Sequence, residues 1–305
     1  MRIVLIGQAA FAERVLDGLR VAGHDVVATY CPPDQPDAKA DPFAARAQAL
    51  DIPLHRHRSL KGAEIAAEVA GYGADLGVLA YVTQIVPPPV FEAPRLGSIC
   101  FHPSLLPRYR GGSAIPWQII KGETRTGVTV FWVDTGIDTG PILLQREAAI
   151  GPDDTAGSLY YNTLFQLGVD TVIDAVGLAS SAAPPRMAQD ESQATYDPLC
   201  RDEHAVIDWQ RPAAEVYNLI RGCDPQPGAS VTRAGARLRC HDARRAEAVS
   251  AAPGIVAAIG PDGVTIAAVG GAIRVGRLRV GAKKLPAAEA AAELGLRVGE
   301  AFGDA

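Results

Sequence analysis

The stretch GSICFHPSLLPRYRGGSAIPWQIIKGETRTGVTVFWVDTGIDTGPILLQ, residues 97–145, decides the fold. It holds two apolar runs of strand length, and each ends at a polar side chain in a turn-rich segment. His102 follows the first run and precedes Pro103, which removes a backbone donor and biases the chain out of the strand. Asp138 follows the second run, in a Gly-, Asp- and Pro-containing segment typical of a tight loop. The sequence therefore predicts an imidazole and a carboxylate at strand ends, as in many active sites.

The surrounding pattern predicts an α/β fold with a Rossmann-like, mainly parallel sheet. Strand-like and helix-like segments alternate along the first half, which favours a sheet covered on both faces. The predicted strands are 3–6, 26–30, 76–80, 98–101, 128–133 and 142–145, and the predicted helices are 11–21, 43–50 and 63–70. Such sheets bind ligands at the carboxyl ends of their strands, so we expect His102 and Asp138 at one edge.

Composition indicates an ordinary globular protein of two domains. The chain has 305 residues, 48% hydrophobic and 21% charged, which is more than one core usually organises. No apolar run approaches the roughly 20 residues of a membrane span, and the apolar start is too short for a signal sequence. We therefore expect a cytoplasmic protein without a membrane partner. The five scattered cysteines predict reduced thiols.

Two cofactor classes are not predicted. A single glycine, Gly7, is followed by Ala9 and Ala12, so the Gly-x-Gly-x-x-Gly fingerprint of a nicotinamide-binding turn is absent from the sequence. His55 and His57 are interpreted as a polar loop and not as a metal site, because no third ligand lies near them in the sequence. We expect neither NAD nor a metal.

The second half has a different texture. We assign residues 1–180 to a catalytic domain and the polar, Pro-containing stretch 181–206 to a linker. Residues 207–305 predict one helix at 212–221, short strands at 255–259, 264–269 and 272–275, and a closing helix at 287–296. This pattern favours a small antiparallel barrel.

The long motif from His102 to Gly111, HPSLLPRYRG, together with the downstream Asp138-Thr139-Gly140, resembles the signature of the folate-dependent formyltransferase family. The resemblance extends over nearly the whole chain, from the first strand to 227–229. Within the family, the sequence is most similar to the amino-terminal hydrolase domain of the 10-formyltetrahydrofolate dehydrogenases, and it ends where that domain would end. The resemblance implies an OB-like barrel in the second domain and 10-formyltetrahydrofolate as co-substrate.

The resemblance also implies the site residues. His102 and Asp138 match the catalytic pair, and Cys100 stands where most members carry an oxyanion-binding asparagine. A thiol is a weak donor, so transfer to an amine is in doubt; the hydrolase domain also lacks that asparagine. The predicted substrate and folate positions, which include backbone groups of the 79–87 loop, are Leu79, Tyr81, Gln84, Ile85, Val86, Ser104, Arg108, Tyr109, Arg110, Val133 and Ile137.

Formyl transfer needs a base for the nucleophile, a donor for the oxyanion and a proton for the leaving nitrogen. His102 and Asp138 can supply these groups together. As single residues, His102 could instead cap a strand and Asp138 could form an Asx-turn. Cys100 is interpreted as a small buried hydrophobe in preference to a reactive thiol, because no basic residue adjoins it in the sequence.

The acceptor is left open by the sequence. Water, a thiol on a carrier domain or a separate carrier protein, an amino sugar or other small amine, and methionyl-tRNA all remain, as do hydrolase and transferase activity and the oligomeric state. From Ala205 to Ala305 the chain has 13 basic and 10 acidic residues, a weak footprint for nucleic acid. A folate-binding module without catalysis is the non-enzyme alternative, disfavoured by the presence of both His102 and Asp138.

Overall fold

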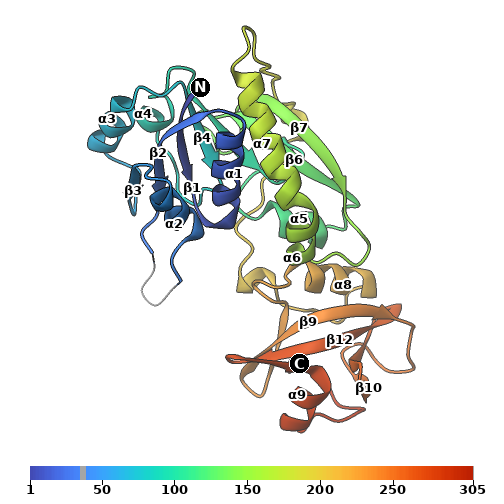
Figure 1. Cartoon of the computed structure of the whole chain (residues 1–305). Coiled ribbons are helices and arrows are strands. Elements are labelled where there is room, and N and C mark those ends of the chain that lie inside the picture. Colours follow the sequence, from blue (N-terminus) through green and yellow to red (C-terminus); the bar gives the residue numbers. More distant parts are fainter. Residues whose placement is uncertain (35–38, 305) are drawn as a thin grey trace. The chain divides into compact units, whose positions relative to one another are not determined.

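The computed structural model describes residues 1–34 and 39–304. They form two compact units, each described by itself below (Figure 1). Unit 1 comprises Met1–Gly112, Thr126–Ala148 and Asn162–Asp197, and unit 2 comprises Ser113–Arg125, Ala149–Tyr161 and Pro198–Ala305. Two segments that precede residue 180 in the sequence therefore group with the carboxyl-terminal unit.

Unit 1 contains a seven-stranded sheet in the order β3-β2-β1-β4-β5-β6-β7. Its strands are β1 (Arg2–Gly7), β2 (Asp25–Cys31), β3 (Leu54–Arg56), β4 (Leu76–Ala80), β5 (Ser98–His102), β6 (Arg125–Trp132) and β7 (Ile142–Ala149). The helices that pack with it are α1 (Ala9–Val21), α2 (Pro42–Ala49), α3 (Ala63–Gly71), α4 (Pro88–Phe91) and α7 (Phe165–Ala179). Neighbouring strands from β3 to β5 are parallel, which confirms the predicted Rossmann-like fold class.

Alternating side chains of the strands supply two cores. Val4 and Ile6 of β1 lie in one cluster with Ile65 and Val69 of α3. The other face is covered by α1, which packs against α7 (Figure 1). Phe101 of β5 points to this second face, where its ring lies 4.4 Å from the ring of Phe11. Since successive residues of a strand alternate, Cys100 and His102 lie on the α3 face.

The direction of β6 corrects one sequence-based inference. We expected Asp138 at the carboxyl edge of the sheet because it follows a strand of a parallel sheet. However, β6 is antiparallel to β5, with His102 opposite Thr129 and Ile99 opposite Trp132. The carboxyl end of β6 therefore lies beside the amino end of β5, and Asp138 reaches the site by a returning loop.

Most predicted elements of the first half are found within a few residues of their expected positions. The longer helices that were not predicted are α5 (Ala114–Ile120) and α7; the short helices α4 and α6 (Ala156–Leu159) and the short strand β3 were not predicted either. In α7, glycine replaces better helix formers because space is short: a Cβ on Gly168 would lie 2.6 Å from the Phe101 ring. A π-helical turn, η1 (Tyr160–Leu164), joins α6 to α7.

Unit 2 is built on an antiparallel sheet, as predicted for the second half. Its order is β10-β11-β12-β9-β8, with β13 paired to β12. The strands are β8 (Ser230–Arg233), β9 (Ala236–Ala246), β10 (Val256–Gly260), β11 (Gly263–Ala268), β12 (Gly271–Val280) and β13 (Lys283–Pro286). The helices are α5, α6, α8 (Ala213–Gly222) and α9 (Ala287–Glu293), with short 3-10 turns at η2 (Glu191–Gln193) in unit 1 and η3 (Asp202–His204) in unit 2.

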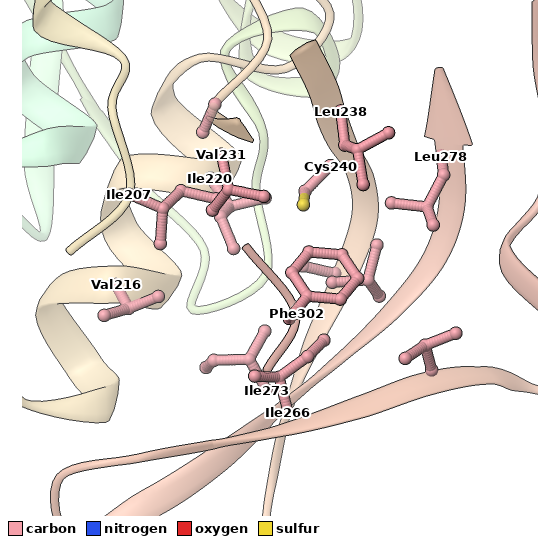
Figure 2. Close-up of a cluster of buried hydrophobic side chains, with 14 of the residues drawn as sticks. Ile207, Val216, Ile220, Val231, Leu238, Cys240, Ile266, Ile273, Leu278 and Phe302 are labelled. Carbon is pink, nitrogen blue, oxygen red and sulfur yellow. The ribbon is translucent and has the colours of Figure 1, made fainter. Parts of the chain in front are cut away.

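A single hydrophobic cluster organises unit 2. Figure 2 shows Leu238 and Cys240 of β9, Leu278 of β12 and Ile220 of α8 directed toward Phe302. Phe302 is fully buried and packs edge-on against Trp209, with 5.8 Å between the ring centroids. The last residues of the chain thus complete this core.

Residues 181–206, predicted as a linker, are held at several points. Met187 pairs with Ile142 of β7, and Tyr196 forms a bridge with Arg110. Val206 forms a bridge with Ser230 of β8. The polar composition of this stretch reflects its side-chain hydrogen bonds, and not a free connection.

Candidate active site

His102 is held at the end of β5 by its ring. The side chain is buried, and its Nε2 lies 2.7 Å from the carbonyl oxygen of Tyr109. Because a carbonyl only accepts, Nε2 must carry the hydrogen of this bond. Nδ1 is the other ring nitrogen, and it lies 3.5 Å from Oδ2 of Asp138.

Asp138 reaches His102 because the loop after β6 folds back over β5. Val133 donates its backbone N–H to the Ser98 carbonyl, and it packs with Cys100 in the cluster on the α3 face. The loop closes where the N–H of Trp132 donates to the Pro141 carbonyl. Asp138 has a φ of 56°, a left-handed conformation that is tolerated best by Asn, Asp and Gly.

The segment 102–111 closes around this pair. The N–H of Gly111 donates to Oδ2 of Asp138 at 2.8 Å, which leaves the carboxylate a fixed direction. Gly111 has a φ of 102°, and a Cβ there would lie 2.8 Å from the Asp197 carbonyl oxygen. Only glycine satisfies both conditions without strain.

Ser104 was predicted to line the substrate pocket, but it is fully buried. Its hydroxyl donates to the Arg108 carbonyl at 2.7 Å and so shapes the loop. Beneath it, the Thr129 hydroxyl donates to the Ser104 carbonyl, and the Gln145 amide donates to the Thr129 oxygen. The structure therefore gives Ser104 a contact within the loop in place of one toward a ligand.

Arg110 was predicted as a substrate or folate position, but its guanidinium is buried and bound within unit 1. It donates to Glu191 at 2.6 Å and to the side-chain oxygen of Gln189 at 2.8 Å. The hydrogen bond from Arg110 lowers the pKa of Glu191 below its ordinary value. Gln189 in turn donates to the carbonyls of Asp138 and Gly140. Arg110 therefore positions the Asp138 loop through Gln189.

The remaining predicted residues of this motif differ in exposure. Tyr109 is buried with a φ of 62°, and its carbonyl holds His102. Arg108 is exposed, and its guanidinium carbon lies 5.6 Å from the centre of the Tyr109 ring. Of the two arginines, Arg108 is thus the one that faces solvent.

Cys100 lies on the same face of β5 as His102, two residues before it. Its side chain packs against Leu106, Phe131 and Ile142, and also against the cluster on the α3 face. Burial raises the pKa of the Cys100 thiol, and the negative charge of Asp138 adds to the shift. The group is therefore a neutral thiol near neutral pH, with little nucleophilic character.

Two loops beside Cys100 each have one valine that packs in the hydrophobic cluster of the α3 face and other apolar side chains that stay exposed. The two valines are Val86 and Val133. Cys100 packs against the same cluster, as does Leu79 of β4, which pairs with Cys100 of β5. The apolar side chains of these loops that remain exposed are Tyr81, Ile85 and Ile137. Large apolar groups left on loops above a strand end are typical of a ligand site.

Gln84 is tied to the neighbouring β3 segment. Its amide nitrogen donates to the His57 carbonyl at 3.2 Å, whereas its oxygen is buried without a partner among the described residues. A small cleft at the ends of β1, β2 and β4 is lined by Gln8, Tyr30, Thr83 and Gln84. A broader hollow at the opposite ends of β1 and β2, around Arg2 and Asp25, contains none of the predicted site residues.

The sequence analysis missed the residues that hold Asp138 in place. Gln189 and Glu191 belong to the stretch that was interpreted as a linker, and Thr195, whose hydroxyl accepts from the Tyr109 N–H, belongs to it too. Their polar, irregular pattern carries no periodicity. The only sequence-based reason to expect such residues is that the backbone N–H and C=O groups of a tight loop need hydrogen-bond partners.

We expect Gln189→Ala to lower kcat about 10-fold, which corresponds to ~1.4 kcal/mol, because two backbone carbonyls of the Asp138 loop lose their donor. Steady-state kinetics of tetrahydrofolate release would measure it. The matched control is Gln193→Ala, whose amide donates only to Asp190 at the surface. Equal activity of the two variants would contradict the positioning role of Gln189.

Comparison with known proteins gives the class of this fold and site. Residues 1–176 match the family described as Formyl transferase, and residues 200–294 match the family described as Formyl transferase, C-terminal domain. The chain therefore belongs to the formyl transferase family, and the prediction of a formyltransferase-type enzyme is confirmed.

Particular relatives narrow the comparison. The chain is 42% identical over 243 residues to cytosolic 10-formyltetrahydrofolate dehydrogenase of Mus musculus, covering 78% of this chain and 27% of that protein. It is 38% identical over 295 residues to methionyl-tRNA formyltransferase of Dinoroseobacter shibae, covering 95% and 96% of the two chains. The chain thus spans about a quarter of the length of the dehydrogenases that it matches.

Solved structures share the fold. HypX from Aquifex aeolicus in complex with tetrahydrofolic acid aligns with a TM-score of 0.70 at 23% identity, over 96% of this chain and 47% of that one. The N-formyltransferase from Helicobacter canadensis aligns with a TM-score of 0.68 at 18% identity, over 90% and 98% of the two chains. Among the described residues, none of the helices has the length and apolar character needed to cross a membrane.

Proposed function

We propose that this enzyme takes the formyl group from 10-formyltetrahydrofolate and passes it to water or a thiol, giving tetrahydrofolate. The observation that carries the proposal is the 3.5 Å approach of His102 Nδ1 to Asp138 Oδ2 beside the exposed apolar side chains Ile85 and Ile137. The apolar loops suit a flat pterin, and the pair suits the chemistry of its formyl nitrogen. The relatives named for 10-formyltetrahydrofolate support the same co-substrate.

The chemistry follows from the fixed directions of the two side chains. Asp138 accepts a proton from the attacking water or thiol as the new bond to the formyl carbon forms. His102 donates from Nε2 to the Tyr109 carbonyl, and its protonated form carries a second hydrogen on Nδ1, which stabilises the oxyanion. The bond from carbon to N10 then breaks, and N10 takes the proton that Asp138 received. With water the products are formate, a proton and tetrahydrofolate.

Cys100 is the reason to favour water or a thiol as acceptor. The neutral thiol contacts the Phe101 carbonyl at 3.5 Å, so the site has no strong side-chain donor at this position. A tetrahedral intermediate formed with an amine would be stabilised less here than one beside an asparagine.

We place the reaction in the cytosol, in line with the pattern of reduced cysteines.

The test is tetrahydrofolate release from 10-formyltetrahydrofolate by purified protein with no acceptor, with a thiol, with an amino sugar, or with charged methionyl-tRNA. Turnover with water or thiol alone supports the proposal. Turnover that requires an amine replaces it with a transferase, and binding of folate without turnover under any condition would identify a module that only binds folate.

We expect Cys100→Asn to raise the rate of transfer to an amine about 10-fold, because it places an amide donor where the oxyanion forms. Removal of such a donor elsewhere costs ~3 kcal/mol, and a site not adapted to it recovers only part. Cys100→Val is the matched control, since it keeps a small side chain without a donor. The measurement is formyl transfer to the amine; equal rates for both variants would show that no oxyanion forms at this position.

A specific feature of unit 2 favours methionyl-tRNA as a second candidate acceptor. On β9 and β12, Arg244 lies directly opposite Arg274, and Arg239 lies opposite Arg279. Like charges in directly opposed positions destabilise a sheet unless an anion lies over them. Asp202 binds Arg239, whereas Arg274 has a carboxylate only at 3.9 Å, that of Asp262.

The length of the match to methionyl-tRNA formyltransferase supports the same candidate, since it includes the second unit. By composition, the basic charge of unit 2 is only a weak indication of nucleic-acid binding. The register of β9 against β12 brings basic residues together in opposed positions. The arm of the assay with charged methionyl-tRNA decides between this acceptor and water.

A further inference from the structure

His55, His57 and Glu68 converge outside the active site. His55 lies in β3, His57 follows its last residue, and Glu68 lies in α3. Nδ1 of His55 lies 3.0 Å from Oε2 of Glu68, and Nε2 of His57 lies 3.4 Å from Oε1. All three ligand-type atoms lie within 4.8 Å of one another. We expected no metal site at His55 and His57 because no third ligand lies near them in the sequence. The fold brings Glu68 to them, so this reason does not hold.

The orientation of His55 suits a metal ligand. Its second nitrogen, Nε2, lies 2.6 Å from the hydroxyl of Tyr72. A metal-binding imidazole typically donates its other N–H to an oxygen, which fixes the ring and its tautomer. With Nε2 donating to Tyr72, the lone pair of Nδ1 points to the side of Glu68. The rings of His55 and His57 are nearly parallel, with an angle of 9°.

A second observation concerns Tyr30, which lies against the same cluster. Tyr30 is fully buried, and its ring stacks on His55 with 4.7 Å between the ring centroids. Its hydroxyl lies next to the Glu68 carboxylate but makes no hydrogen bond of standard geometry among the described residues. A buried hydroxyl in this state is costly, and a water on a metal would give it a well-directed partner.

We propose that His55 Nδ1, His57 Nε2 and a carboxylate oxygen of Glu68 bind a divalent transition-metal ion of the zinc class. Two imidazoles and a carboxylate are a common donor set for such ions, with a water as the fourth ligand. Tyr72 orients His55, and the Tyr30 hydroxyl is placed to bond that water. The three ligand side chains are only partly buried, so an ion can enter from solvent.

The site also has a connection to the folate loop. Gln84, in the 79–87 loop, donates to the backbone carbonyl of His57. An ion bound to His57 would therefore fix the residue to which this loop is hydrogen-bonded. The proposed ion takes no part in the formyl chemistry, since His102 and Asp138 belong to other elements. The proposal is therefore independent of the identity of the formyl acceptor.

The test uses the full chain after treatment with a chelator. Titration calorimetry with Zn²⁺ should show one equivalent bound, and Co²⁺ should give the intense visible absorption of a four-coordinate ion. Glu68→Gln and His57→Gln should each weaken Zn²⁺ binding at least 10-fold. Tyr72→Phe should weaken it on the order of 10-fold, as expected for a group that orients a ligand.

His204→Gln is the matched control, because this histidine lies in η3 outside the cluster. Melting curves without metal establish that each variant folds, and Glu68→Gln keeps the shape of the side chain. Unchanged Zn²⁺ affinity in Glu68→Gln and His57→Gln, or a Co²⁺ spectrum of the wild type that stays that of the aqueous ion, would overturn the proposal. The cluster would then be a set of hydrogen bonds alone.

Discussion

His102→Gln and Asp138→Asn should each lower kcat about 1,000-fold while the affinity for tetrahydrofolate changes only a few-fold. General acid–base catalysis typically contributes 10²- to 10⁴-fold, and a lost oxyanion donor costs a similar amount. Both substitutions keep the size of the side chain. Asparagine can still accept from the Gly111 N–H, so the loop keeps its position while the base is lost.

The double variant gives a sharper result. Because the two side chains act on one transition state, their effects on kcat should not add. The kcat of the double variant should be only a few-fold lower than that of the less active single variant. Stopped-flow or steady-state release of tetrahydrofolate measures turnover, and fluorescence titration measures binding. The control is Asp17→Asn, a surface carboxylate paired with Arg46. Full additivity would mean that the residues act in separate steps.

Phe302→Ala should destabilise unit 2 by about 3–5 kcal/mol, the usual cost of removing a large buried aromatic side chain. Phe302 is fully buried near the end of the chain, where it packs against Trp209 and lies among the buried side chains labelled in Figure 2. Urea unfolding monitored by tryptophan fluorescence, to which Trp209 contributes, would measure the loss. Phe302→Leu should cost less than half as much, because it refills most of the space.

Val298→Ala is the control for this experiment, since that valine is 60% exposed and should change the free energy of unfolding by no more than about 0.5 kcal/mol. If Phe302→Ala left the unfolding midpoint unchanged, the last residues would not contribute to the core. Activity of the destabilised variant would also report whether formyl release needs a folded unit 2.

The local order of the first half was readable from the sequence. Apolar runs between turn residues marked β1 and β4, and the Ala-rich segments marked α1 and α2, because alternation and helical periodicity are properties of neighbouring residues. The same locality placed His102 at the end of β5, where Pro103 stops the strand. The long motif around it identified the family, and the resemblance predicted a role for Asp138.

The tertiary structure decided what depends on partners far along the chain. Strand direction is one example: nothing within 125–132 distinguishes an antiparallel β6 from a parallel one, yet this direction sends Asp138 back over Cys100 through a loop. The partners of that loop are another, because Gln189 lies 51 residues from Asp138. Hydrogen bonds of this kind leave no periodic trace in the sequence.

The same reason explains the metal-type cluster and the opposed arginines. His55 and His57 were visible as a pair, but Glu68 joins them only because α3 packs over β3 and its neighbours. Arg244 and Arg274 were visible as members of two basic groups, but only the register of β9 against β12 places them face to face. The sequence by itself determined most of the longer elements of the first half and the family, and it predicted His102 and Asp138 as a pair. Packing between distant segments determined which side chains meet.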